Sequence, residues 1–268
     1  MRKIDVEELK QTQLEILDVV ANFCEENQIN YWIDCGTLLG AIRHKGYIPW
    51  DDDIDVGMLR PDYDKFMKLF NEKNTRYKFH CIENDPKFFL PHGKVFDTET
   101  ILYEPDEKSS KIAINIDIFV YDNAPDDDKL ARKMLFYSNF YNRCNIRRMM
   151  STFSLLRRDY SFPRRIIEHI ISLCLRIFPR YYFVNKSIKN SRSCISQDTK
   201  RVGNFSSFTR MTCDKRVFNE FIDVEFEGRK YKAPIGYDEW LRSFYGDYMQ
   251  FPPVEKRVST HTFVAYKN

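Results

Sequence analysis

Residues 34–58 read DCGTLLGAIRHKGYIPWDDDIDVGM and hold the densest set of structural signals in the chain. The residues around their start predict a short strand over 30–34, which leads to a turn at Gly36. A helix over 37–44 follows, and a second strand is expected over 53–58. Such an alternation of strands and helices predicts an α/β or α+β protein.

The flanking sequence continues this alternation. Apolar residues recur at helical spacing over 5–28 and again over 61–71, where Pro61 marks the helix start. We also expect a hairpin over 226–231 and a short helix over 238–245. Further strands of the first half are expected at 77–82, 93–96, 101–103 and 112–120. The chain has 268 residues, of which 43 % are hydrophobic, so it is long and apolar enough to bury a core.

Four aspartates lie within five residues, at positions 51, 52, 53 and 55. On an extended backbone Asp51, Asp53 and Asp55 share one face, because side chains alternate between the two faces. Like charges at this spacing are unfavourable without a counter-charge, and Mg²⁺ or Mn²⁺ is the simplest one. Asp117, on an apolar strand of its own, is expected to complete the cage. The alternative is a solvated acidic turn. An EF-hand is a poor fit, because this stretch lacks the glycine and the glutamate that an EF-hand loop requires.

The glycine turn at the start of this stretch predicts a phosphate site. Gly36 and Thr37 lie between a strand and a helix, where free backbone N–H groups bind anions. Arg43 adds positive charge further along the same helix. A glycine turn, paired carboxylates and a third carboxylate on another strand suit metal-assisted transfer of a phosphorus-containing group. In that chemistry one carboxylate deprotonates the attacking hydroxyl.

Several segments of the chain carry motifs that occur together in one family. They are Gly36–Arg43, Gly46–Asp55, Lys94–Asp97 with Thr100, Ile116–Phe119, Ala233–Tyr237, and Tyr245–Met249 followed by Pro252 and Pro253. Together they resemble the LicD family of phosphocholine and related phosphotransferases, within the nucleotidyltransferase superfamily. The resemblance extends over residues 30–260, apart from a basic middle segment at 129–200 that carries no such motif.

The resemblance implies an α+β fold with a polymerase-β-like mixed-sheet core, a helical insertion and a C-terminal subdomain. It implies Mg²⁺- or Mn²⁺-dependent transfer of a phospho-alcohol, such as phosphocholine, from a CDP-alcohol donor to a sugar hydroxyl. The acceptor would be a glycan or a lipid-linked glycan of teichoic acid, capsule or lipopolysaccharide. Carried over by position, the catalytic residues are Asp53, Asp55 and Asp117, the metal ligands are Asp51, Asp53, Asp55 and Asp117, and the donor-binding residues are Gly36, Thr37, Arg43 and Lys94.

Two other functions stay open from the sequence. One is a nucleotidyltransferase that adds the nucleotide itself to RNA or to another hydroxyl acceptor. The other is a non-catalytic protein that binds an anionic surface without a metal. An assay that shows which half of the nucleotide donor is transferred to the acceptor distinguishes nucleotidyl transfer from the LicD-type reaction. Binding of Mg²⁺ or Mn²⁺ argues against the second.

Charge is distributed unevenly along the chain. Residues 129–192 hold 15 Lys and Arg against 2 acidic residues, a net charge of +13, whereas the rest carries −10. This asymmetry predicts a polyanionic partner, for which an anionic membrane is favoured over nucleic acid. Residues 164–178 within this segment predict an amphipathic helix. It is either an ordinary helix packed on the core or an interfacial helix at a membrane.

The same features suggest the organisation of the chain. We expect a catalytic core over 1–128, a basic helical insertion over 129–197 and a C-terminal subdomain over 198–268. The seven cysteines form no C-x-x-C motif, which favours a reducing compartment. The N-terminus lacks the apolar segment of a signal peptide, and no stretch of 18 apolar residues is present. The expected location is therefore cytoplasmic, with peripheral contact at the inner face of the membrane.

Overall fold

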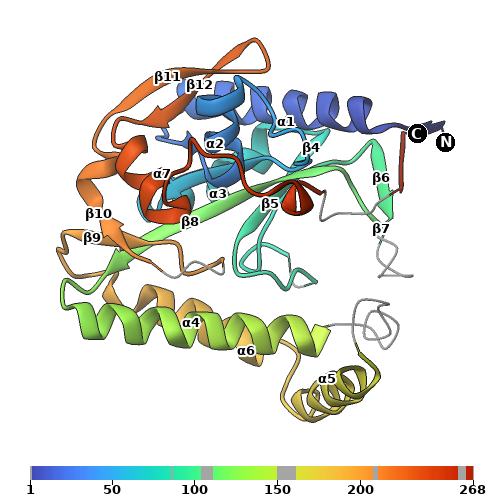
Figure 1. The fold of residues 1–268 in the computed structure, drawn as a ribbon, viewed down its shortest axis with the longest axis vertical. Helices are drawn as coiled ribbons and strands as arrows, with labels where there is room; N and C mark the ends of the chain where they lie inside the picture. The colour runs from blue at the N-terminus through green and yellow to red at the C-terminus, as the bar shows by residue number, and fades with distance from the viewer. Residues whose placement is uncertain are drawn as a thin grey trace.

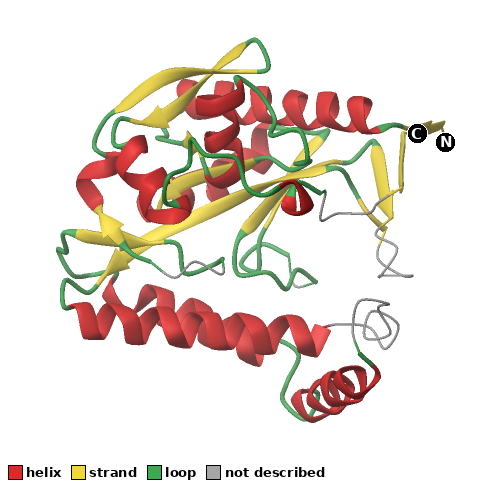
Figure 2. Cartoon of the chain, in the orientation of Figure 1, coloured by secondary structure: helices red, strands yellow, loops and turns green. Residues whose placement is uncertain are grey.

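The computed structural model describes residues 2–85, 87–103, 111–149, 161–207, 211–258 and 264–267 (Figure 1). It shows an α+β protein with a mixed sheet, which confirms the α+β part of the expected fold (Figure 2). The α-helices of the described residues are α1 Val6–Glu26, α2 Cys35–His44, α3 Arg60–Lys73, α4 Asp128–Met149, α5 Phe162–Leu175, α6 Tyr182–Ser191 and α7 Tyr237–Tyr245. Short 3₁₀ turns are η2 Arg192–Cys194, η3 Lys215–Phe218 and η4 Val254–Lys256.

The strands form one large sheet, one small sheet and a hairpin. The large sheet has the order β10-β9-β8-β3-β2, and β5 pairs with both β8 and β4. The small sheet has the order β1-β13-β6-β7, and β11 pairs with β12. The strands are β1 Arg2–Ile4, β2 Trp32–Ile33, β3 Asp55–Leu59, β4 Tyr77–His80, β5 Gly93–Asp97, β6 Thr100–Tyr103, β7 Lys111–Ile112, β8 Asn115–Ala124, β9 Arg201–Gly203, β10 Cys213–Asp214, β11 Phe221–Phe226, β12 Arg229–Pro234 and β13 Val264–Lys267.

Strand β8 is the centre of the large sheet. It pairs with β3 in parallel, and with β5 and then β9 in antiparallel orientation. The expectation of a single strand over 112–120 is wrong, because the chain forms two strands there, β7 and β8. At the break the Ile114 N–H donates to the Thr100 hydroxyl at 2.9 Å, and the Asp97 N–H donates to the Ile114 carbonyl at 2.9 Å. These side-chain and loop bonds take the place of continuous ladder pairing.

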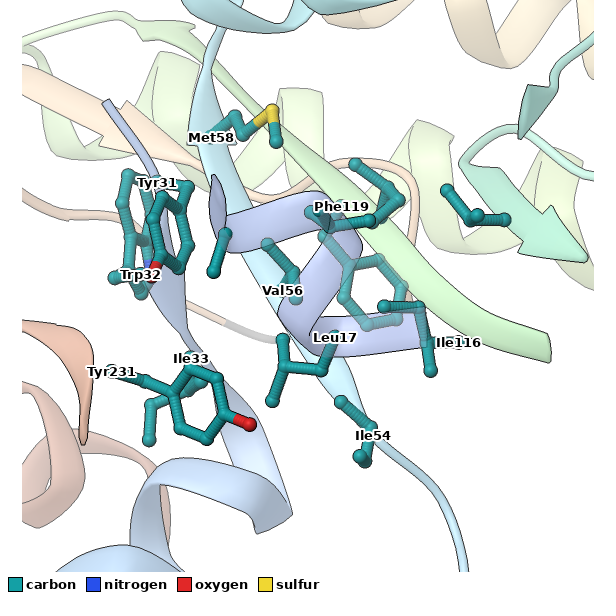
Figure 3. Packing of buried hydrophobic residues seen from close by; sticks show 14 of the residues in the cluster. Leu17, Tyr31, Trp32, Ile33, Ile54, Val56, Met58, Ile116, Phe119 and Tyr231 are labelled. Atoms are coloured by element: carbon teal, nitrogen blue, oxygen red, sulfur yellow. The ribbon is translucent and has the colours of Figure 1, made fainter. Parts of the chain in front are cut away.

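Helix α1 covers one face of the sheet. The Asp5 side chain caps it by accepting from the Glu8 N–H at 2.9 Å. Its apolar stripe recurs at helical spacing and is buried, as the sequence predicts. Figure 3 shows Leu17 of this stripe lying among Ile33 of β2, Val56 of β3 and Ile54, which directly precedes β3. This packing holds β2 and β3 rigidly, so that the side chains on the opposite face have a firm support.

Helices α4 and α6 pack against each other below β8 (Figure 1). The first turn of α4 is capped by the Asp127 carboxylate, which accepts from the N–H groups of Lys129 and Leu130, each at 2.9 Å. A second, smaller apolar cluster joins Met134 and Leu135 of α4 to Ala124 at the end of β8 and to Phe205. No helix of the described residues is long and apolar enough to cross a membrane.

Candidate active site

Three charged side chains lie in one row across the central strands. In the parallel pair of β3 and β8, Asp55 is the register partner of Asp117. In the antiparallel pair of β5 and β8, Lys94 is the register partner of the same Asp117. Register partners point to one face of a sheet, so two carboxylates and an ammonium from three separate segments are neighbours.

Asp117 is the centre of this row. Its carboxylate forms an ion pair with the Lys94 ammonium, which also donates to the Asn115 side-chain oxygen at 3.0 Å. His92 Nε2 lies 3.6 Å from the other Asp117 oxygen. Burial lowers the pKa of His92, so the ring is neutral at pH 7 and Lys94 carries the positive charge of the group.

The first turn of α2 lies next to the row. Gly36 is tightly enclosed there, because a Cβ added to it would lie 2.6 Å from an Asp51 carboxylate oxygen. The Asp51 carboxylate thus occupies the helix N-terminus, where the helix dipole favours negative charge. Thr37 is buried, and its hydroxyl accepts from the Asp55 N–H at 2.9 Å. In this structure Thr37 positions the strand that carries Asp55.

Strand β3 begins only at Asp55, so Asp51 and Asp53 precede it. The expectation that a strand starts at residue 53 is therefore wrong, and regular alternation does not explain where these side chains lie. The Asp51 N–H instead donates to the Ile48 carbonyl at 2.8 Å in a turn, and the Asp52 carbonyl accepts from the Gln13 side chain at 3.0 Å. These hydrogen bonds, which are not part of the sheet, fix the loop of residues 51–53 next to Asp55.

Negative charge is concentrated around Asp55. Burial raises the pKa of its carboxyl well above the ordinary value, and the charges of Asp53 and Asp117 raise it further. Cys35, at the start of α2, also has a raised pKa, first through burial and then through Asp34 and Asp55. The aspartates therefore act on one another electrostatically.

Asp34 is a structural member of this neighbourhood. It is completely buried, and its carboxylate accepts from the Tyr121 hydroxyl at 2.5 Å and from the Trp240 indole at 3.0 Å. Burial raises the pKa of Asp34 although both hydrogen bonds lower it. Its backbone N–H donates to the Asp55 carbonyl at 2.9 Å. Through Asp34, α7 in the C-terminal part is tied to the strand of the candidate site.

Arg43 lies at the other end of α2. Its guanidinium donates to the Tyr248 carbonyl at 2.8 Å and lies over the Phe251 ring at 4.8 Å. His44 and Trp50 also contact Phe251, with ring centroids 5.4 and 6.4 Å away. The structure therefore does not bring Arg43 to the carboxylate row, and its expected contact with the donor stays a prediction.

Two residues at the site are missing from the sequence-based set. His92 lies just before β5 and two positions before Lys94, and a histidine so close to a candidate lysine was a signal that could have found it. Tyr245 on α7 lies close enough to Cys35 and Asp55 that these groups raise the pKa of its phenol, after burial. Tyr245 begins one of the motifs of the sequence, but only the tertiary packing of α7 places it beside Cys35 and Asp55.

A divalent cation is the group that this donor set implies. Asp51, Asp53, Asp55 and Asp117 offer only carboxylate oxygens, which Mg²⁺ and Mn²⁺ prefer, and their charges are concentrated around Asp55. Among the described residues, no three Asp, Glu, His or Cys side chains converge closely enough to hold a metal ion as they stand. The set fits a cation in charge and chemistry, and holding one would require these carboxylates to converge more closely than they do here.

A row of carboxylates beside a lysine on a mixed sheet, next to a helix N-terminus, suits one class of protein. That class is the enzymes that transfer phosphorus-containing groups. Comparison with known proteins agrees with this class. The family model described as LicD/FKTN/FKRP, nucleotidyltransferase domain, matches residues 28–178.

Individual relatives support the same assignment. The chain is 32 % identical over 276 residues to the lipopolysaccharide cholinephosphotransferase LicD of Haemophilus influenzae, with 99 % of both chains covered. It is 44 % identical over 43 residues to the human ribitol 5-phosphate transferase FKRP, which covers 16 % of this chain and 9 % of FKRP. The chain belongs to the LicD family, as its motifs suggest, and is a phosphotransferase.

Proposed function

We propose that this phosphotransferase moves a phospho-alcohol, first of all phosphocholine, from a CDP-activated donor to a sugar hydroxyl of a glycan. The observation that carries the proposal is the register that sets Asp55, Asp117 and Lys94 side by side. The relative with 99 % coverage is by name a lipopolysaccharide cholinephosphotransferase, which favours phosphocholine and a glycan acceptor. The family description favours a polymerase-β-like core for the mixed sheet.

In the proposed reaction the acceptor hydroxyl attacks the donor phosphorus in line with the bond to CMP. The new O–P bond forms while the P–O bond to CMP breaks, and the hydroxyl proton passes to a carboxylate. Asp117 is our candidate for this base, because its side chain is 19 % exposed and lies within reach of an incoming hydroxyl. Lys94, paired with Asp117, supplies positive charge for the donor phosphates.

We further propose that Asp53, Asp55 and Asp117, with Asp51 beside them, bind Mg²⁺ or Mn²⁺. When bound, the cation neutralises charge on the donor phosphates. Calorimetric titration with Mn²⁺ tests this without any turnover. Wild-type protein is expected to bind Mn²⁺ and Asp53→Asn is not, while Asp223→Asn in the β11–β12 hairpin binds like wild type. Equal Mn²⁺ binding by wild type and Asp53→Asn would contradict the ligand set.

The donor is identified by thermal stability. The protein is heated with CDP-choline, CDP-ethanolamine, CDP-glycerol, CDP-ribitol or CMP, each with and without Mg²⁺. We expect a Mg²⁺-dependent rise in melting temperature with one CDP-alcohol that exceeds the rise with CMP, because ligands that bind only the folded state stabilise it. Equal shifts with CMP and every CDP-alcohol would show that the alcohol is not recognised.

A nucleotidyltransferase reaction is the second candidate, because the matched family model is described as a nucleotidyltransferase domain. Two preparations of the selected donor separate the candidates, one labelled in the cytidine and one in the alcohol. Transfer of the alcohol label alone to the acceptor supports the phosphotransferase proposal. Transfer of the cytidine label would replace it by nucleotidyl transfer.

A further inference from the structure

Helix α5 exposes its apolar side to water, whereas a surface helix of a globular protein normally turns that side toward the core. Ser172 is the buried residue of this helix, although the helix is rich in isoleucine and leucine. The apolar residues that are exposed in and just after α5 are Phe162, Ile166, Ile167, Ile170, Ile171, Leu173, Ile177 and Phe178. The exposed fraction reaches 73 % at Phe162 and 84 % at Ile177. The alternative of a helix packed on the core by its apolar face is therefore wrong.

At 100° per residue, the exposed apolar residues occupy one contiguous half of α5. The opposite half carries Arg164, Arg165, Glu168 and Ser172. A monomeric soluble protein rarely leaves a contiguous apolar patch of this kind in water. The pattern therefore indicates that the outer half of α5 has an apolar partner.

Polar contacts hold the helix in this orientation. Glu168 accepts from Arg147 of α4 at 2.7 Å, and Arg148 donates to the Phe178 carbonyl at 3.0 Å. Ser172, at the middle of the packed half, is 1 % exposed. Because the polar half of α5 is tied to α4, rotating the helix to bury its apolar half would break these contacts.

The surroundings of α5 are strongly basic. Residues 129–192 carry a net charge of +13, and the exposed face of α4 combines Arg132 and Arg143 with the aromatic side chains of Phe136 and Phe140. A second copy of the chain on this surface would bring two basic faces together, which is unfavourable. A phospholipid surface with anionic headgroups offers both an apolar layer and the opposite charge.

We propose that α5 binds an anionic phospholipid bilayer by lying in its interface, with its apolar half among the acyl chains. The helix has 14 residues, too few to span the hydrocarbon layer, and no described helix is long and apolar enough to do so. The basic residues of α4 and α5 contact the headgroups. The inference is independent of the proposed reaction, because binding requires neither donor nor acceptor.

Flotation of the full-length protein with lipid vesicles tests the proposal. One set of vesicles is pure phosphatidylcholine, and the other contains phosphatidylglycerol at about a third of the lipid. Wild-type protein is expected to float with the second set only, and binding is expected to fall as salt shortens the range of the electrostatic attraction. The double variant I167E/I170E is expected to bind about tenfold or more weakly, because it places two charges in the apolar layer.

A control variant carries a single apolar-to-glutamate change at an exposed residue outside α5. Val254, 72 % exposed, serves this purpose as Val254→Glu, which is expected to float like wild type. Thermal melts of both variants check that the fold is intact, since the substituted side chains are exposed. Flotation of I167E/I170E like wild type would overturn the proposal, as would the absence of wild-type flotation.

Cys174 provides a second, direct readout. It is the exposed cysteine of the seven and lies on the apolar half of α5, so a maleimide dye that reports polarity labels it selectively. The dye emission is expected to shift to shorter wavelength when anionic vesicles are added, and Cys174→Ser is the labelling control. A shift that depends on protein concentration and not on vesicles would instead assign the surface to self-association and overturn the proposal.

Discussion

Asp117 is the residue on which the candidate site depends most. It contacts Lys94 and His92 and is the register partner of Asp55. We expect Asp117→Asn to lower turnover by about 10²-fold or more, because the amide keeps the shape and loses both the charge and the base. Asp223→Asn is the matched control, since Asp223 also pairs with a lysine, Lys232 at 2.7 Å, but on the exposed hairpin. Steady-state transfer assays with the selected donor measure both variants.

Wild-type turnover by Asp117→Asn would remove Asp117 from the mechanism and leave the family assignment untouched. Equal losses in both variants would point to a general effect of removing charge. A circular dichroism melt accompanies the assay, because the loss is informative only if the variant protein is folded.

Gly57 makes a separate prediction about packing. A Cβ at this position would lie 2.4 Å from the Trp32 ring, which is completely buried and stacked on Phe218 with ring centroids 4.3 Å apart. Gly57→Ala is therefore expected to destabilise the protein by about 1–3 kcal/mol, measured by urea unfolding. The double variant G57A/W32L is expected to lose less than the sum of the single losses, because the smaller side chain makes room. Additive losses would show that the two residues do not compete for this space.

At the scale of the element, an ion pair between Arg147 and Glu168 helps to attach α5 to α4. The hydrogen bond from Arg147 lowers the pKa of Glu168 below its ordinary value of 4.5. A carboxyl whose pKa is lower in the folded than in the unfolded state stabilises the fold at neutral pH. This stabilisation is lost as the pH falls through the folded-state pKa. Glu168→Gln is expected to cost about 0.2–1 kcal/mol at pH 7, and the difference from wild type is expected to shrink as the pH falls through the lowered pKa of Glu168.

Urea unfolding of wild type and Glu168→Gln at several pH values measures this. Glu239→Gln is the control, since Glu239 forms an exposed pair with Arg216 at 3.1 Å away from α5. A difference for Glu168→Gln that stays constant down to acidic pH would mean that the substitution acts through packing and not through charge.

On the scale of the whole molecule, the C-terminal part shares the core of the N-terminal part. Trp32 stacks on Phe218, Asp34 accepts from Trp240, and β13 pairs with both β1 and β6. A chain truncated after residue 197 is therefore expected to lose cooperative folding, because it exposes the apolar side chains that these contacts bury. Near-ultraviolet circular dichroism and thermal melts, with the full-length chain as reference, test this. A cooperative melt of the truncated chain would show that residues 1–197 fold independently.

The alternation of helices and strands and the acidic cluster were predictable from local sequence. Apolar spacing reports whether a segment is helical or extended, because it depends on neighbours a few positions away. For this reason α1, α3 and β5 lie close to their expected positions. The need of Asp117 for a partner was also predictable, because a charged residue within an apolar strand requires one, and in the structure Lys94 is such a partner.

Contacts between distant segments were decided by tertiary structure. Strand register brings Lys94 to Asp117, and the segment just before β5 places His92 3.6 Å from the same carboxylate. The packing of α7 brings Tyr245 to Cys35, whereas α2 directs Arg43 toward Tyr248. The outward orientation of α5 belongs to the same category. Its amphipathic pattern is readable in the sequence, but which half meets α4 depends on Glu168 finding Arg147. Local patterns specify conformation along the chain, and the choice of partners follows from the energy of packing the whole molecule.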